Sequence, residues 1–187
     1  MNDHVHQLIG IMNPCHCGNF GHHDRKCRCT ASSLSGFQGM LSGALLERFD
    51  MYLFVPSMSW QEEDATERSV VIYRRVQAAW LRQIQRQGKQ NAQLSLDELE
   101  AYSMMTKRDW RAYYRMAARY NLSNRAQRNW LALSRTLADL DGLEAVTMQH
   151  IVAGLALMNP DRREYNQSFD AMRMPEVQRV QTRDTRA

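Results

Sequence analysis

The sequence predicts a mainly α-helical protein in which a short segment with strands precedes an all-helical domain. Two observations indicate this fold class. After residue 61, hydrophobic residues recur at three- and four-residue spacing, as they do on one face of an α-helix. Before residue 56, apolar residues form only short runs that end at Asn-Pro or Pro. The composition, with 44% hydrophobic and 24% charged residues, is typical of a globular protein.

The first 60 residues contain two predicted strands and one predicted helix. The strands are expected at His6–Met12 and Tyr52–Val55, and a proline follows each of them closely. Between them, a loop rich in Cys, Gly and His runs to about Ser35. Hydrophobic residues at helical spacing then predict a short helix within Met40–Phe49.

Five helices are predicted in the remainder. The first, Glu62–Arg86, has acidic residues near its start and basic residues near its end, an order that stabilises the helix dipole. Ser95 and Glu98 form a capping-box pattern at the start of the second. In the fourth, a stripe of hydrophobic residues including Trp130 predicts a core-facing side. The last four helices are expected at Leu96–Met104, Thr106–Arg119, Ser123–Leu140 and Thr147–Met158.

These patterns divide the chain into residues 1–60, residues 61–158 and a polar tail at 159–187. The tail is rich in Arg and has no periodicity, so we expect it to be disordered. No window reaches the roughly 18 apolar residues of a membrane span, and the first residues lack the pattern of a signal peptide. We therefore expect a cytoplasmic protein with no membrane partner.

Four cysteines form the most distinctive local pattern. Nine residues separate Cys15-x-Cys17 from Cys27-x-Cys29, and Gly18 permits a tight turn after the first pair. Four thiolates can hold zinc in a tetrahedral site, although C-x-C is more cramped than C-x-x-C. In a reducing compartment the alternatives are free or redox-active thiols, ahead of a disulfide. Three histidines of the same loop are alternative metal ligands: His16, His22 and His23.

Three polar residues are candidates for contact with phosphate. Asn13 ends an apolar strand, where phosphate-binding folds place ligand-facing side chains, and an Asn-Pro turn is the alternative. Arg125 lies in the first turn of a helix, where a cation is unfavourable unless an anion is nearby. Two interpretations remain: Arg125 binds a phosphate, or it pairs with a distant carboxylate. Arg48 pairs either with a ligand or with Glu47 or Asp50 at the surface.

Basic residues are concentrated in one part of the chain. Seven of them lie between Lys107 and Arg128 against a single acidic residue, Asp109, in a chain of formal charge +4. This segment is a candidate surface for phosphate or nucleic acid. The alternative is a solvated helix face with long arginine stems packed on apolar neighbours.

Five segments resemble, in order and separation, the ComM/YifB family of magnesium-chelatase-like AAA+ ATPases: IMNPCHCGNFG, CRC, LSGALLERFDMYLFVP, RQGKQNAQL and NLSNRAQRNWLALSRTLADLDG. The resemblance covers about Leu8–Met158. It implies that residues 1–60 are the C-terminal remnant of an α/β AAA+ core and that residues 61–158 are the helical AAA+ lid. In this family a ring similar to a hexameric helicase promotes DNA branch migration during natural transformation.

The resemblance also implies roles for three residues around ATP bound between subunits. Asn13 matches the sensor-1 asparagine, which helps to position the attacking water. Arg48 matches the arginine finger, which contacts the γ-phosphate of ATP on a neighbouring subunit. Arg125 matches sensor 2, which contacts the phosphates from the lid.

The sequence departs from the family pattern in ways that affect catalysis. It contains no G-x-x-x-x-G-K-[ST] phosphate-binding loop, and no apolar strand ending in Asp-Glu precedes Asn13 to hold magnesium. His16 stands where the family usually has proline. We therefore expect a truncated member that does not hydrolyse ATP alone. If functional, it would bind DNA or join a ring of full-length subunits, which complete the ATP and magnesium site; the alternative is a gene fragment with no function of its own.

A second class of function is a zinc-stabilised nucleic-acid-binding or regulatory module that makes no use of ATP. Three basic residues within the cysteine loop favour it: Arg25, Lys26 and Arg28.

Overall fold

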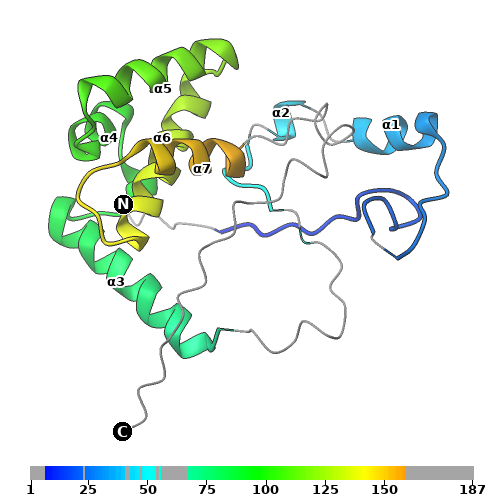
Figure 1. Cartoon of the computed structure of the whole chain (residues 1–187), viewed down its shortest axis with the longest axis horizontal. Coiled ribbons are helices and arrows are strands. Elements are labelled where there is room, and N and C mark those ends of the chain that lie inside the picture. Colours follow the sequence, from blue (N-terminus) through cyan, green and yellow to red (C-terminus); the bar gives the residue numbers. More distant parts are fainter. Residues whose placement is uncertain are drawn as a thin grey trace, which may run out of the picture.

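The computed structural model describes residues 7–22, 24–40, 43–46, 48–53, 55 and 67–158. All regular elements of these residues are helices, which confirms the mainly α fold class. Helices α3 to α7 gather into one body, and α1, α2 and the cysteine loop lie to one side of it (Figure 1). The elements are α1 (Ala31–Gly39), α2 (Gly43–Leu46), α3 (Ser69–Gln87), the 3-10 turn η2 (Asn91–Gln93), α4 (Leu96–Ser103), α5 (Lys107–Arg119), α6 (Asn124–Leu140) and α7 (Met148–Met158).

Three predicted helix starts are confirmed, each by a side chain that accepts a free backbone N–H. The Ser95 hydroxyl accepts from Glu98 N, and the Glu98 carboxylate accepts in return from Ser95 N at 2.8 Å, which completes the capping box of α4. Thr106 and Ser123 cap α5 and α6 in the same way. These bonds satisfy donors that a helix cannot pair internally.

Helix α3 begins later than its charge pattern predicted. It starts at Ser69 instead of Glu62, and residues 61–66 lie outside the described ranges. Its first turn has no acidic residue, because Glu67 precedes the helix and pairs with Arg75 at 3.1 Å. The helix ends as expected at Gly88, whose φ of 74° lies in the left-handed region that favours glycine.

The two expected strands are wrong for their described residues. Neither residues 7–12 nor residues 52, 53 and 55 pair with another strand in the described part of the chain. A strand requires hydrogen bonds from a neighbouring strand, and no described segment supplies them. Leu8, Ile9 and Ile11 are consequently 79%, 76% and 97% exposed.

The helix expected within Met40–Phe49 is only the four-residue α2, and α1 occupies part of the segment predicted as a loop. Residues 41, 42 and 47 lie outside the described ranges. Helix α1 begins where the Thr30 hydroxyl accepts a hydrogen bond from Ser33 N at 3.2 Å. Its sequence, ASSLSGFQG, has no continuous apolar stripe, so hydrophobic periodicity gave no signal for it.

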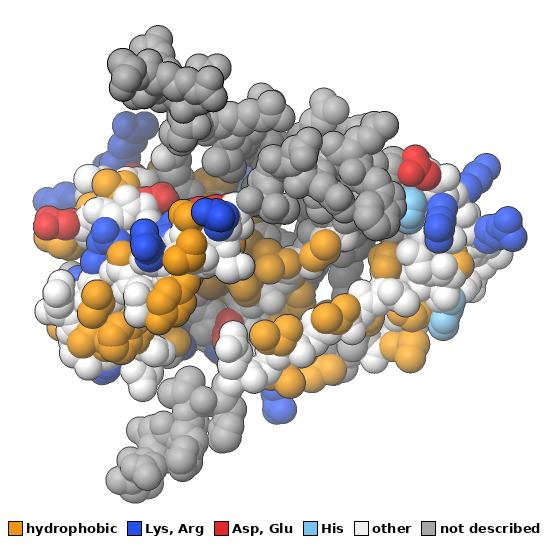
Figure 2. Space-filling model, turned by 90° about the horizontal axis from the view of Figure 1, so that it is seen from below, with side chains coloured by type: hydrophobic (Ala, Val, Ile, Leu, Met, Phe, Trp, Pro, Cys, Tyr) orange, Lys and Arg blue, Asp and Glu red, His pale blue; other side chains and the backbone are white. Residues whose placement is uncertain are grey.

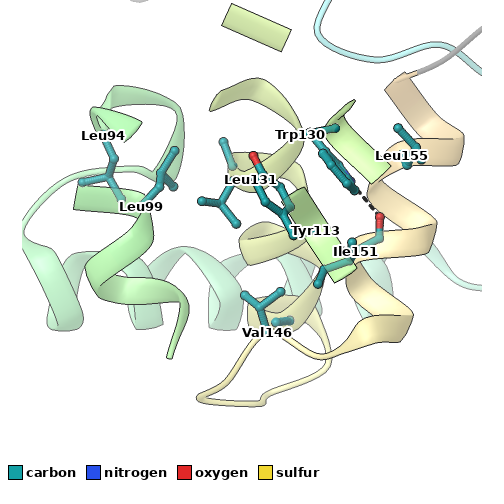
Figure 3. Close-up of a cluster of buried hydrophobic side chains, with 11 residues drawn as sticks. Leu94, Leu99, Tyr113, Trp130, Leu131, Val146, Ile151 and Leu155 are labelled. Carbon is teal, nitrogen blue, oxygen red and sulfur yellow. Dashed lines mark hydrogen bonds between the residues drawn. The ribbon is translucent and has the colours of Figure 1, made fainter. Parts of the chain in front are cut away.

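Helix α6 lies at the centre of the helical body and contacts α3, α4, α7 and η2. Trp130 is fully buried, its ring stacks on Tyr113 with centroids 4.3 Å apart, and its Nε1 donates to the carbonyl of Ile151 at 2.7 Å (Figure 3). Of the predicted stripe only Trp130 is buried, and the other members are half-buried: Ala126, Leu133, Leu137 and Leu140. The buried face of α6 instead includes Leu131, Arg135 and Ala138. A central helix is covered on more sides than an amphipathic pattern indicates.

A buried ionic network joins α6 to α3. Asp139 and Arg135 have no exposed surface, and their side chains pair at 2.9 Å. Arg86 of α3 donates to both Asp139 oxygens at 2.5 and 3.0 Å, and Asn91 donates to Asp139 Oδ2 at 2.9 Å. Burial acts to raise the pKa of Asp139, but these hydrogen bonds and the nearby arginine charges hold it below its ordinary value. The carboxylate is therefore ionised and fully paired.

The expected boundary between residues 60 and 61 and the tail at 159–187 lie outside the described residues, so the domain division stays a prediction. Every helix in the described ranges is too short or too polar to cross a bilayer.

Replacing Asp139 by Ala is expected to lower the free energy of unfolding by about 3–5 kcal/mol, because Arg135 is left buried and unpaired. Urea unfolding followed by circular dichroism measures it. Asp97→Ala is the matched control: this carboxylate is exposed in the first turn of α4, so its loss costs about 1 kcal/mol or less. Equal losses in the two variants would contradict the network's importance.

The same carboxylate predicts a pH dependence. Because its folded pKa is depressed, its stabilisation is present above the unfolded pKa of about 3.9 and is lost as the pH falls through the folded value. The stability difference between wild type and Asp139→Asn should stay constant from pH 7 to about pH 5 and shrink below about pH 4. A difference that shrinks near neutral pH would argue for another group.

Gly154→Ala is expected to destabilise the crossing of α6 and α7. A Cβ at Gly154 would lie 2.6 Å from Ser134 Oγ and 3.3 Å from Ser134 N, and that hydroxyl already donates to the Trp130 carbonyl at 2.9 Å. Overpacking of this kind costs about 1–3 kcal/mol. Thermal unfolding measures the loss, with Ala153→Ser on the exposed face of α7 as control. A Gly154→Ala protein as stable as the control would refute the close approach.

Candidate functional site

The four cysteines of the N-terminal loop converge on one point. All four Sγ atoms lie within 4.8 Å of one another, although nine residues separate the two pairs. Cys15 Sγ is 3.4 Å from Cys17 Sγ and 3.8 Å from Cys27 Sγ, and the distance from Cys17 to Cys27 is 3.6 Å. Cys15 is buried and Cys17 is exposed at the rim. The loop thus forms a compact cluster of thiols.

These sulfur distances fit a tetrahedral metal site. Four sulfurs bonded to one zinc ion at about 2.3 Å lie about 3.8 Å apart along the tetrahedron edges. A disulfide requires about 2.05 Å, and all four cysteines are free thiols in the structure. The cluster can therefore hold a thiophilic metal ion such as zinc.

The backbone of the loop is shaped for this convergence. Gly18 has φ of 73° and donates from its N–H to the Cys15 carbonyl at 3.0 Å, which makes the tight turn expected from the sequence. Backbone N–H groups of Arg28 and Asn19 approach Cys17, and they lower the pKa of this thiol to about 6. Amide groups around a sulfur stabilise the thiolate, which is the form that binds metal. Backbone hydrogen bonds act in the same direction at Cys27 and Cys29, but burial and the neighbouring thiols outweigh them and raise the pKa of both groups.

His16 and His22 are not part of the sulfur cluster and have other partners. The His16 ring packs edge-on against Phe37 with centroids 4.7 Å apart, and His22 Nδ1 accepts from the backbone of Asp24 and Arg25. Within the described residues the metal-binding group therefore contains only the four cysteines. His23 lies outside the described ranges.

The surface around the cysteines is basic. Arg25, Lys26 and Arg28 are all exposed, and Figure 2 shows Lys, Arg and His side chains at this end of the molecule. This charge favours an anionic partner near the loop.

Residues 48–53, which we call the Arg48 segment, are hydrogen-bonded to the helical body. Asp50 Oδ1 accepts a hydrogen bond from Asn129 Nδ2 of α6 at 2.7 Å, and Tyr52 N donates to the Leu157 carbonyl of α7 at 2.7 Å. Arg48 itself is exposed and has no ion pair with Asp50 or another described residue. Glu47, the other carboxylate expected to pair with Arg48, lies outside the described ranges.

Arg125 lies beside this segment, in the first turn of α6. It is exposed, and no described carboxylate pairs with it. An open depression of about 720 Å³ brings it together with Asp50; the lining residues are Asp50, Leu96, Asn124, Arg125, Arg128 and Asn129. The free N–H groups of a helix start and an unpaired arginine together attract an anion.

Asn13 is exposed, and its side chain makes no hydrogen bond within the described part of the chain. A Cβ at Gly10, three residues before it, would lie 3.9 Å from the Phe49 ring, so the two N-terminal segments run close together. The cysteine cluster follows Asn13 in the sequence and does not include it.

Sequence reasoning missed Asp50 and Asn129 as the pair that fixes the Arg48 segment. Asn129 is a buried polar residue on a helix whose pattern we interpreted only as hydrophobic core. A buried amide requires a hydrogen-bond partner, and that requirement is the signal that was available.

Comparison with known proteins gives matches across both parts of the chain. Residues 3–63 match the family of magnesium chelatase, subunit ChlI, and residues 66–157 match the magnesium chelatase, subunit ChlI C-terminal family. The chain is 33% identical over 161 residues to the uncharacterized protein YifB of Salmonella typhimurium and 32% identical to YifB of Escherichia coli. It is 31% identical over 154 residues to the competence protein ComM of Haemophilus influenzae.

The alignments cover 83% of this chain for the YifB proteins and 80% for ComM, but only 31% and 30% of those relatives. The chain therefore spans about a third of the length of the relatives that it matches. The two family matches, the three relatives and the helical fold agree with one another, and the chain belongs to the ComM/YifB-type family of magnesium-chelatase-like proteins.

Proposed function

We propose that this chain supplies the helical lid of a ring-shaped ATPase that acts on DNA. In this proposal Arg48 and Arg125 contact a nucleotide bound by another subunit. The observation that carries the proposal is the Asp50–Asn129 hydrogen bond, which holds the Arg48 segment at the depression lined by Arg125. Arg125 lies in the first turn of α6 and Arg48 lies two residues before Asp50, and neither pairs with a described carboxylate, which suits the phosphates of ATP.

ATP hydrolysis requires more than these arginines. A phosphate-binding loop supplies backbone N–H groups and a lysine, and a carboxylate holds magnesium. These 187 residues contain no G-x-x-x-x-G-K-[ST] sequence, so our proposal assigns that half of the site to protein outside them. Arg48 then stabilises charge on the γ-phosphate, Arg125 contacts the phosphates from the lid, and Asn13 helps to position the attacking water.

The cysteine cluster has a structural role in this proposal. Zinc bound by Cys15, Cys17, Cys27 and Cys29 closes the loop between Asn13 and α1, and binding free energy of this kind stabilises the fold around the site. The same cluster, with its basic surroundings, also supports the second candidate, a zinc-stabilised module that binds nucleic acid without ATP.

The chain is expected to contain one zinc ion per molecule when it is purified without chelators. Elemental analysis measures the zinc content. Cys27→Ser should lose most of it, because three thiolates and a hydroxyl bind zinc less tightly than four thiolates. His16→Ala is the matched control from the same loop and should retain zinc, since its ring lies against Phe37. Sub-stoichiometric metal that Cys27→Ser leaves unchanged would favour free thiols.

The isolated chain is expected to release no phosphate from ATP above background. Mixed into rings of a full-length family member, the wild-type chain should sustain hydrolysis at the neighbouring site. Arg48→Ala should reduce it at that site by roughly a hundredfold or more, since arginine fingers contribute about 10³–10⁵ in kcat. Arg74→Ala removes an exposed arginine of α3 and is the control.

Phosphate release across a titration of each variant measures the effect. Magnesium-dependent hydrolysis by the chain alone would overturn the proposal that the phosphate-binding half comes from a neighbour. Equal curves for wild type, Arg48→Ala and Arg74→Ala would leave Arg48 as an ordinary surface residue.

A further inference from the structure

One face of α5 carries a row of basic side chains, which we call the basic stripe. Lys107 and Arg108 are adjacent in the first turn, and Arg111, Arg115 and Arg119 follow at three- or four-residue spacing, so the row runs along one side of the helix, and all five side chains are exposed. The basic stripe consists of Lys107, Arg108, Arg111, Arg115 and Arg119.

Neighbouring carboxylates do not neutralise this charge. No member of the basic stripe forms an ion pair with any residue that the structure describes. The two closest acidic groups in the sequence have other partners: Asp109 accepts from the Thr106 hydroxyl at 2.7 Å, and Glu100 accepts from the Tyr114 hydroxyl at 3.1 Å. The basic stripe therefore carries positive charge that no described carboxylate neutralises.

An aromatic ring lies within the basic stripe. Tyr114 is 49% exposed, its ring stacks on Trp110 with centroids 5.6 Å apart and an interplanar angle of 25°, and its hydroxyl is held by Glu100. The ring is thus fixed before any ligand arrives, which lowers the entropic cost of binding. It lines an open depression of about 550 Å³ with three members of the stripe: Arg108, Arg111 and Arg115.

Exposed arginines around an exposed aromatic ring that is held in place fit one class of polymer best. Guanidinium groups bind phosphate oxygens in bidentate fashion, and aromatic rings stack on unpaired bases. A duplex hides its base faces, and an acidic peptide has few planar groups to stack on a tyrosine. We infer that the basic stripe and Tyr114 bind single-stranded DNA, with the arginines on successive phosphates and Tyr114 on a base.

This inference deepens the proposed function by naming the surface of the lid that holds DNA. It rests on that function only for the identity of the polymer. The binding assay contains neither ATP nor a second chain, so its outcome is independent of whether Arg48 acts on a neighbour's nucleotide.

The test is fluorescence anisotropy of a labelled 20-nucleotide oligothymidylate with the full chain over a range of salt concentrations. The double variant Arg111→Ala, Arg115→Ala should bind more weakly and reduce the slope of log K against log salt by about 1.4, since each phosphate contact contributes about 0.7 for single strands. The control double variant, Arg68→Ala with Arg74→Ala, removes the same charge from exposed positions at the start of α3 and should leave the slope unchanged.

Tyr114→Leu separates stacking from charge. It should lower the affinity for the single strand about fivefold or more and leave binding of a duplex of equal length unchanged. Tyr73→Leu is the control, because Tyr73 is 60% exposed on α3. Circular dichroism melting checks that each variant is folded.

Three outcomes would overturn the inference. The first is an equal effect of the two double-arginine variants, and the second is a Tyr114→Leu protein with wild-type affinity for the single strand. The third is displacement of the oligonucleotide by polyglutamate at equal charge concentration, which would assign the basic stripe to acidic proteins.

Discussion

The helical body depends on one buried carboxylate, that of Asp139. Arg135 has no exposed surface and lies on the same helix one turn before it, so each group would be costly to bury without the other. Arg86 and Asn91 bring α3 and η2 to the same carboxylate. The network therefore fixes how α3 crosses α6, and it does so through directional bonds that an apolar contact would not provide.

Helix α6 transmits this constraint to the candidate site. Its C-terminal half holds the ionic network, its middle packs Trp130 against Tyr113, and its N-terminal half carries Arg125 and Asn129. The Asn129 amide donates a hydrogen bond to Asp50 and so holds the Arg48 segment against α6. Packing far from the depression thus determines which side chains line it, and substitutions in the core are expected to alter the site through α6.

Local chemistry explains what the sequence could predict. The starts of α4, α5 and α6 follow from Ser95, Thr106 and Ser123, because a cap needs only residues within one turn. The four cysteines were identified as one cluster because tetrahedral metal sites have few ligand sets. Strands at His6–Met12 and Tyr52–Val55 were wrong for their described residues, since strand formation depends on a partner that a linear pattern cannot show. The Asp50–Asn129 bond joins residues 79 positions apart, so no local pattern identifies Asp50 as the partner that the buried Asn129 amide requires.

The central claim is that the chain presents Arg48 and Arg125 to a nucleotide held by a neighbour. The most direct measurement is a cryo-electron microscopy structure of a ring that contains this chain and a full-length family member, with magnesium and a non-hydrolysable ATP analogue. The account predicts the Arg48 guanidinium about 3 Å from the γ-phosphate, with Arg125 and the start of α6 facing the same phosphates. A ring in which α6 begins away from the nucleotide, with Arg48 in solvent, would contradict it.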